Sequence, residues 1–159
     1  MNRRTALKLG GAALAAAAVR PSLARAEADE GAVLLELWRR ESAAALAYDL
    51  VLYADPILAI VRSHEEDHAR AVATALAAVG LNPPRAPEEP ADLDDASRRL
   101  AEAGPERRAV LAAAVALEED LVAIYSSALP SFVDEKIAMT AATVLGSHAQ
   151  HLFILREVT

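Results

Sequence analysis

Apolar side chains recur along this chain at the three- and four-residue spacing of an amphipathic helix. The spacing predicts four long helices, at about 29–53, 56–79, 106–129 and 131–158. Pro and Gly mark the breaks between them, because proline cannot continue a helix and glycine commonly ends one. Gly80 is expected to end the second helix, and Ser131 is expected to cap the fourth. The predicted fold class is all-α. The predicted inward positions, helix by helix, are Leu34, Leu37, Trp38, Ala45, Tyr48 and Leu52; Ile57, Val61, Val72, Leu76 and Val79; Leu111, Val115, Val122, Tyr125 and Leu129; and Ile137, Ala141, Val144, Leu152 and Leu155.

The connections between these helices predict the topology. Tight turns join the first helix to the second and the third to the fourth, which makes each pair antiparallel neighbours. Residues 81–91 contain four prolines and are expected to be extended and semi-rigid. A short helix is predicted over 92–103, with Asp92 or Asp94 as its N-cap. The pattern indicates an antiparallel four-helix bundle, ferritin-like in arrangement, with two helical hairpins joined by one long crossover.

Six acidic or histidine residues interrupt the apolar faces, and together with two tyrosines they follow a pattern that occurs twice. In each half a Glu precedes a Tyr by seven residues, and a later helix carries two metal-binding side chains three residues apart. The first half has Glu41, Tyr48, Glu65 and His68, and the second has Glu118, Tyr125, His148 and His151. Seven residues are about two helical turns and three are just under one, so each pair shares a helix face.

Carboxylates on an inward face need a compensating charge, because burying an unpaired carboxylate costs several kcal/mol. The apolar faces carry no Lys or Arg, and Arg62 lies near enough to answer Glu65 alone. The remaining candidates for the compensating charge are histidines and divalent cations. A set of oxygen and imidazole ligands suits Fe, Mn or Zn. Two alternatives stay open: the acids and histidines pair with one another, or the charged run from His64 to His68 is a solvated face. His64 itself is expected at the surface or edge.

These residues resemble the metal-binding pattern of the ferritin-like superfamily, in particular rubrerythrin and exported bacterial ferritin-like domains. The resemblance covers about 30–158. It implies iron or manganese as cofactor, with zinc less favoured and an empty site as the alternative. It assigns terminal carboxylates to Glu41 and Glu118, a bridging carboxylate to Glu65, and terminal imidazoles to His68 and His151. Tyr48 resembles a tyrosine that lies beside the metals in ferritins, and Tyr125 holds the matching place in the second half.

The chain departs from this family at His148, where a second bridging Glu is expected. A neutral imidazole does not bridge two metals as a carboxylate does. With His148 as a sixth ligand, the site would hold three carboxylates and three imidazoles. A single metal, a mixed pair, a zinc site and an empty site are the alternatives.

Residues 1–26 differ from the rest of the chain. A basic head with Arg3 and Arg4 precedes an apolar run of 11 residues, and Ala24-Arg25-Ala26 fits a signal-peptidase site. The paired arginines indicate a twin-arginine signal, with an ordinary secretory signal or a helical extension as alternatives. The domain would then span 27–159 and be exported to the periplasm or cell envelope. Removing five of the 16 basic residues and none of the 23 acidic ones changes the net charge from -7 to -12.

Composition narrows the function classes. Ala and Leu dominate a chain that is 54% hydrophobic and only 4% aromatic, which favours closely packed helices. The absence of Cys excludes disulfides, iron–sulfur clusters and cysteine zinc sites. The acidic charge argues against nucleic acid as a partner, and the apolar run is too short to span a membrane. Metal ions and a second copy in a homodimer are the expected partners. The first hypothesis is a metal-dependent redox or metal-handling protein, the alternative is a metal-free scaffold, and iron storage in a shell is weaker.

Overall fold

The computed structural model describes residues 30–159. The signal predicted over residues 1–26 lies outside this range, as does the predicted helix start at Asp29. The described chain contains helices and no strand, which confirms the predicted all-α class. A first helix covers residues 30–50. It is followed by α2 (Ile57–Ala78), η1 (Pro90–Asp92), α3 (Asp95–Ala101), α4 (Arg107–Ala128), η2 (Leu129–Ser131) and α5 (Glu135–Val158).

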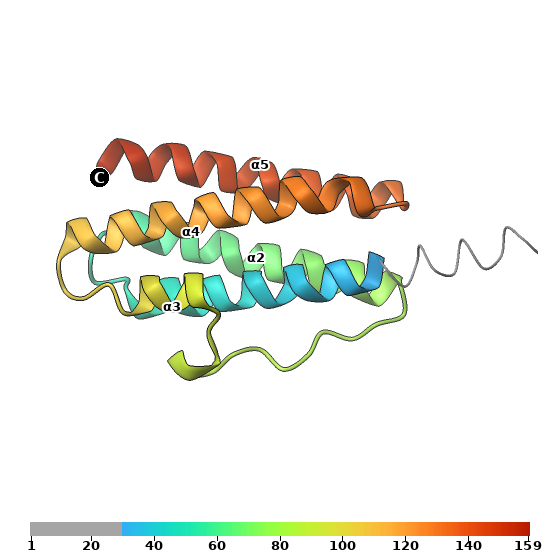
Figure 1. Ribbon diagram of the computed structural model, residues 1–159, viewed down its shortest axis with the longest axis horizontal. Helices are drawn as coiled ribbons and strands as arrows, with labels where there is room; N and C mark the ends of the chain where they lie inside the picture. The colour runs from blue at the N-terminus through green and yellow to red at the C-terminus, as the bar shows by residue number, and fades with distance from the viewer. Residues whose placement is uncertain (1–29) are drawn as a thin grey trace, which may run out of the picture.

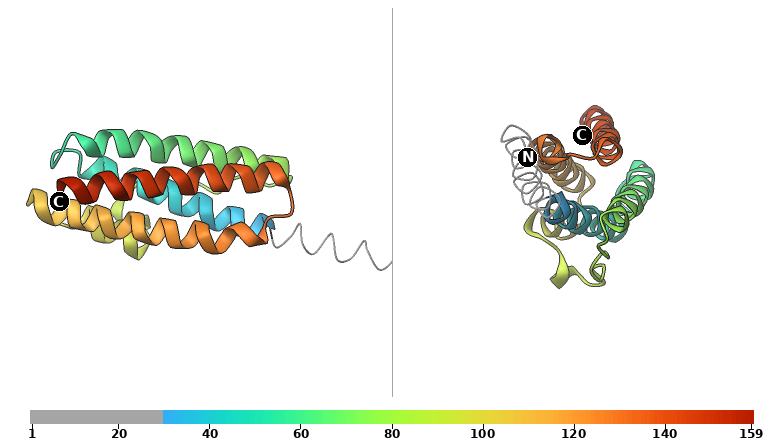
Figure 2. Two further views of the ribbon diagram at one scale, coloured as in Figure 1. Left: turned by 90° about the horizontal axis from the view of Figure 1, so that it is seen from above. Right: turned by 90° about the vertical axis from the view of Figure 1, so that its right-hand side faces the viewer.

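The four long helices lie side by side and form an antiparallel bundle (Figure 1). The first helix and α2 make one hairpin, and α4 and α5 make the other. The Pro-rich segment between the hairpins runs back along the bundle before the chain enters α3 and α4. The end-on view in Figure 2 shows the four long helices around a common axis. The predicted arrangement of two hairpins and one long crossover is therefore confirmed.

Glycine ends α2 as predicted. Gly80 has φ 76°, a left-handed conformation that suits a residue without Cβ. The Leu81 N–H donates to the Leu76 carbonyl at 2.9 Å, and the Gly80 N–H donates to the Ala77 carbonyl at 3.1 Å. These two bonds form a Schellman motif, which satisfies carbonyls at the helix end and turns the chain into the crossover.

Aspartates cap α3 and α5. Asp94 caps α3 by accepting hydrogen bonds from the backbone N–H groups of Ala96 and Ser97, at 2.9 and 3.0 Å. The expectation that Ser131 caps the last helix is wrong. Ser131 lies in η2, and Asp134 accepts from the N–H of Lys136 at 2.7 Å to cap α5. Asp at this position also favours the helix through the positive end of its dipole.

The buried faces differ in detail from the predicted ones. The first helix ends at residue 50 instead of near Tyr53, so Leu52 lies exposed in the turn. Part of the buried face of α4 lies one residue away from the predicted stripe, at Ala114, Leu121 and Ala128, although Leu111 and Tyr125 are buried as predicted. Seven positions predicted to point inward are only half-buried: Ala45, Ile57, Val79, Val115, Val122, Leu129 and Leu152. Alanine-rich helices allow such shifts, because several neighbouring small residues can serve as the contact face.

The apolar interior has two parts. The α3-end core joins the C-terminal half of the first helix to α3 and α4, and includes Tyr48, Leu58, Leu100, Leu111 and Leu121. The η2-end core joins the other ends of the long helices, and includes Leu34, Leu37, Leu76, Tyr125 and Ile137. The six candidate ligands lie where these cores meet, so a polar layer crosses the middle of the bundle. No helix among residues 30–159 combines the length and apolar character that a membrane span requires.

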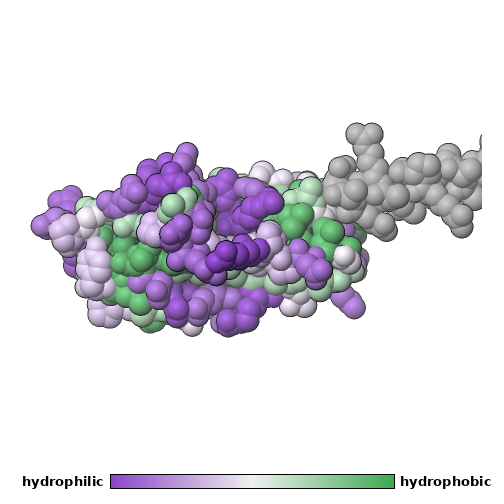
Figure 3. All heavy atoms as spheres, turned by 90° about the horizontal axis from the view of Figure 1, so that it is seen from below, coloured by the Kyte–Doolittle hydropathy of each residue, from purple (hydrophilic) through white to green (hydrophobic). Residues whose placement is uncertain are grey.

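The face that carries the crossover is mostly hydrophilic along its middle, with hydrophobic residues toward both ends (Figure 3). The polar layer is separate from this surface, because each of its six residues is at most 8% exposed.

Candidate metal centre

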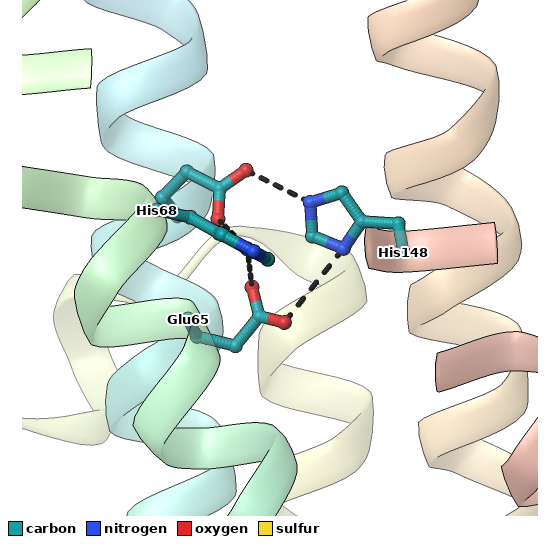
Figure 4. A group of neighbouring side chains, drawn as sticks. Glu65, His68 and His148 are labelled. Carbon is teal, nitrogen blue, oxygen red and sulfur yellow. Dashed lines mark hydrogen bonds and ion pairs between the residues drawn. The ribbon is translucent and has the colours of Figure 1, made fainter. Parts of the chain in front are cut away.

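Six side chains from four helices converge at the middle of the bundle. Glu41 comes from the first helix, Glu118 from α4, and the remaining four from α2 and α5. Glu41, Glu65, Glu118 and His148 are 0% exposed, and His68 and His151 are 8% and 3% exposed. Figure 4 shows Glu65 and His68 on α2 pointing toward His148 on α5. Glu119 is exposed, so the helix phase selects Glu118 as the inward acid of α4.

The six residues form two overlapping sets of four. The first set is Glu41, Glu65, His68 and His148, and the second is Glu65, Glu118, His148 and His151. Each residue offers one ligand atom, and the atoms of a set all lie within 4.8 Å of one another. Glu65 and His148 belong to both sets. The structure therefore places these two residues in the shared position of a two-part centre.

The distances in the first set suit an ion held among the side chains. His148 Nε2 lies 3.0 Å from Glu41 Oε1, and His68 Nδ1 lies 3.4 Å from Glu41 Oε2. His68 Nδ1 also lies 3.6 Å from Glu65 Oε2. Ligand atoms at 2.0–2.2 Å from a tetrahedral ion are separated by about 3.4 Å. The side chains thus already stand near the separations that a shared ion requires.

The second set is similarly close. His148 Nδ1 lies 2.9 Å from Glu118 Oε2, and His151 Nδ1 lies 3.1 Å from Glu65 Oε1. His151 Nδ1 is 3.5 Å from Glu118 Oε2. His151 therefore faces the carboxylates with Nδ1, and its Nε2 points away from them.

Several of these atoms are buried without any hydrogen-bond partner. They are Glu41 Oε2, both carboxylate oxygens of Glu65, His68 Nδ1 and His151 Nδ1. Buried polar atoms are nearly always satisfied, and leaving one unsatisfied costs about 1–3 kcal/mol. The five atoms belong to the two sets and are of the types that bind transition metals. The residues present therefore fit a metal ion, and the cluster could hold one.

Neighbouring histidines and carboxylates shift each other's protonation. Burial alone would raise the pKa of Glu41, but the hydrogen bond to His148 and the charges of His148 and His68 outweigh burial and hold the pKa well below its usual range. The pKa of Glu118 is lowered in the same way, by His148 and His151 against the effect of burial. Burial and the charges of Glu41 and Glu118 raise the pKa of Glu65. Glu65 is thus the carboxylate with the least compensation from the protein.

The imidazoles respond in the opposite sense. Burial would lower the pKa of His148, but hydrogen bonds to Glu118 and Glu41 raise it to about 11. Glu41 and Glu65 likewise overcome burial and raise the pKa of His68 to about 9. Glu118 and Glu65 overcome burial and raise the pKa of His151. In the absence of metal, protonated imidazoles supply the charge that balances the carboxylates.

The Tyr48 hydroxyl contacts the opposite half of the repeat, whereas the Tyr125 ring lies beside His148 of its own half. The Tyr48 hydroxyl donates to Glu118 Oε1 at 2.6 Å, although the sequence places Tyr48 two turns from Glu41. The Tyr125 hydroxyl is buried and has no hydrogen-bond partner. Its ring centre lies 5.4 Å from that of His148. Burial raises the pKa of both tyrosines well above 10, with Glu118 and Glu41 as the next causes for Tyr48 and Tyr125 respectively. Both hydroxyls therefore hold their protons at neutral pH.

His64 is a member of this neighbourhood that sequence reasoning left at the surface. Its ring is exposed as a whole, yet Nδ1 lies 2.9 Å from His151 Nε2, and the two rings stack with centres 5.1 Å apart. Burial and the charges of His151 and His68 lower the pKa of His64. The spacing of four residues to His68 puts His64 on the groove side of the same helix and is the signal that could have found it.

A groove between α2 and α5 reaches this edge of the cluster. It has a volume of about 420 Å³, and its lining includes His64, Asp67, His68, Thr143 and Ser147. His68, the most exposed of the six, is the candidate ligand that lines it. Arg62 does not compensate Glu65, because its guanidinium pairs with Asp49 and Glu66 at 3.2 and 2.9 Å.

Comparison with known proteins decides the family. The profile of the ferritin-like domain family matches residues 38–159, which is well over half the chain. The chain belongs to the ferritin-like domain family. The matched residues include all six candidate ligands and both tyrosines of the centre.

Solved structures agree with this ferritin-like fold. A conserved hypothetical protein (rv2844) from Mycobacterium tuberculosis is similar, with a TM-score of 0.71 and 17% sequence identity. The match covers 83% of this chain and 98% of that one. Likeness at this identity shows the fold alone. No curated protein matches the ferritin-like domain described here.

Proposed function

We propose that this ferritin-like domain binds a transition metal, iron or manganese in preference to zinc, in the polar layer of its core and uses it in a redox or metal-handling role. One observation carries the proposal: five buried ligand atoms without hydrogen-bond partners converge in two sets whose members lie within 4.8 Å of one another. Three buried carboxylates with three imidazoles form a donor set that suits these metals.

Different residues of the chain would have different roles at the centre. Glu41, Glu65, His68, Glu118, His148 and His151 would hold the metal. A bound redox-active ion supplies electron exchange with oxygen or peroxide. Tyr48 donates to Oε1 of Glu118 and so orients Oε2 toward the centre, where His148 Nδ1 lies 2.9 Å away. The apolar cores on both sides exclude water, and the α2–α5 groove gives a small molecule access beside His68.

Metal content tests the proposal. The purified protein is reconstituted with Fe²⁺ or Mn²⁺ under anaerobic conditions, passed through a desalting column, and analysed by mass spectrometry for every transition metal. Glu118→Gln and Glu119→Gln form a matched pair, because the two acids are adjacent on α4 but one is buried and the other exposed. We expect near-stoichiometric metal in the wild type and in Glu119→Gln, and a large loss in Glu118→Gln. Trace metal in all three contradicts the proposal.

A metal-free scaffold is the second candidate, and one observation favours it. The carboxylates and imidazoles already pair with one another, as in the bonds of His148 to Glu41 and Glu118. In a scaffold, replacing the α2 pair by Glu65→Leu with His68→Met leaves the free energy of unfolding unchanged or raises it. In a metal protein, the same double change removes the increase in melting temperature that added metal produces.

We further propose that residues 1–26 direct export by the twin-arginine pathway, on the strength of Arg3, Arg4 and the apolar run that follows. Cell fractionation checks this. Replacing both arginines by lysine should retain the protein in the cytoplasm, whereas an ordinary secretory signal tolerates that change.

A further inference from the structure

The two ring nitrogens of His148 face two different carboxylates. Nε2 lies 3.0 Å from Glu41 Oε1, in the first ligand set, and Nδ1 lies 2.9 Å from Glu118 Oε2, in the second. The ring is 0% exposed and has no room to swing toward solvent. His148 is therefore the residue through which the two sets compete.

We propose that His148 limits the centre to one divalent metal ion per chain, held by one or the other of the two ligand sets. The inference rests on the proposed metal binding and adds its stoichiometry. A neutral imidazole has one lone pair available, while its other nitrogen carries a proton. If Nε2 donates to an ion beside Glu41, the Nδ1–H donates to Glu118. If Nδ1 binds the ion, the Nε2–H donates to Glu41 instead.

Unlike His148, Glu65 is placed so that it can serve both ligand sets at once. Its Oε2 lies 3.6 Å from His68 Nδ1, and its Oε1 lies 3.1 Å from His151 Nδ1. One oxygen thus faces each set, and neither has a hydrogen-bond partner. His148, facing Glu65 across the centre, has both nitrogens in hydrogen bonds. Two ions could share Glu65, but they cannot share a neutral His148.

The charge balance of the polar layer also favours one ion per chain. The three buried carboxylates balance one divalent ion together with one protonated imidazole. Two divalent ions would leave one uncompensated positive charge in a buried layer, which is costly in a medium of low dielectric constant. The ferritin-like pattern with four carboxylates and two imidazoles balances two divalent ions fully. The charge balance thus agrees with one ion, whereas the exclusion of a second ion rests on the position of His148 in both ligand sets.

Metal stoichiometry tests the inference. The full mature chain is loaded with excess Mn²⁺, desalted, and analysed for bound manganese per chain, and isothermal titration gives the number of sites independently. Three proteins are compared: the wild type, His148→Glu, and His151→Glu as matched control. The control gains the same carboxylate on the same helix but keeps His148. We expect one ion per chain in the wild type, two in His148→Glu, and one in His151→Glu.

The outcomes separate the inference from the proposal on which it rests. Two ions in the wild type overturn the inference and leave metal binding standing. Two ions in His151→Glu show that total charge, not His148, sets the number, and also overturn it. No manganese in the wild type overturns the proposed function and the inference together. If His148→Glu does not fold, the electron paramagnetic resonance spectrum of the loaded wild type decides, since isolated Mn²⁺ supports the inference and a spin-coupled pair contradicts it.

Discussion

α2 and α5 each bring two side chains, three residues apart, into the middle of the bundle. The spacing is the same, and the second residue of each pair, His68 or His151, faces a carboxylate through Nδ1. The first residues differ. Both oxygens of Glu65 lack hydrogen-bond partners, whereas both nitrogens of His148 are bonded to carboxylates. Helix periodicity thus decides which positions reach the centre. The type of residue at each position decides whether the side chain is available to bind an ion or neutralises the charge of its neighbours.

Replacing the two central residues by leucine gives the largest expected difference between the helices. In the metal-free protein, His148→Leu leaves Glu41 and Glu118 without their main cation, and removing one partner of a buried ion pair costs about 3–5 kcal/mol. Glu65→Leu removes the carboxylate whose pKa is already raised, and His68 and His151 each keep another carboxylate. We therefore expect Glu65→Leu to change the free energy of unfolding by less than about 1 kcal/mol.

Urea denaturation in the presence of a chelator measures both variants. Equal destabilisation by the two substitutions would show that the helices contribute alike and that His148 is not the counter-charge of the layer.

The pH range over which each helix stabilises the metal-free protein should differ as well. His68 and His148 have pKa values raised from 6.5 to about 9 and about 11. A group whose pKa is raised by folding gives its full stabilisation below pH 6.5 and loses it as pH rises through the folded value. The contribution of His68 should therefore disappear by about pH 9 and that of His148 only toward pH 11.

Unfolding curves from pH 6 to 10 for the wild type and His68→Leu measure this contribution as a difference. A difference that stays constant over this range contradicts the raised pKa of His68. Because a bound metal replaces these protons, metal affinity should increase over the same range.

The tyrosines test whether the two halves are equivalent. Tyr48→Phe removes the 2.6 Å bond to Glu118, and hydrogen bonds to charged groups contribute about 1.5–3 kcal/mol. Tyr125→Phe removes a hydroxyl without a partner and should cost below about 0.5 kcal/mol. Thermal unfolding of the two variants measures the asymmetry, and a larger loss in Tyr125→Phe would reverse it.

His64 contacts His151, but not His68, on the side of the ring that faces away from the centre. His151 Nε2 is held by His64, whereas His68 borders the α2–α5 groove. When His151 binds metal through Nδ1, its Nε2–H donates to His64, and losing such a partner typically lowers metal affinity about 10- to 100-fold. His64→Ala should show this loss by competition with a metal indicator, and His64→Gln, which keeps an acceptor, should recover part of it. Ser147→Ala is the control, because Ser147 lies 3.4 Å from the same nitrogen and should have a smaller effect.

Much of the fold could be predicted from the sequence. The prolines, Gly80 and the apolar spacing located the four long helices within a few residues, and the crossover length gave the topology. The errors came from choices between similar local options. Ser131 and Asp134 are both good capping residues, and the η2 turn after Pro130 moved the helix start to the second. Several adjacent small residues on α4 left its rotation open by one position.

The structure brings the six candidate residues together, but the contacts among them could not be predicted from the sequence. The apolar phase identified six side chains that the structure places together. The partner of each side chain depends on contacts between helices that spacing along one helix does not contain. Tyr48 therefore bonds to Glu118 on another helix, and His64 reaches His151 from an exposed position.

The division of the apolar interior into an α3-end core and an η2-end core has an evolutionary consequence. Each core joins the long helices on its own side of the polar layer, so the helices remain anchored at both ends whatever the layer contains. Substitutions in the layer can then accumulate without loss of the bundle, and a lineage can exchange one donor for another while it keeps its shape. The layer is therefore a suitable place for designed metal chemistry, because its residues can be replaced while the two cores hold the helices together.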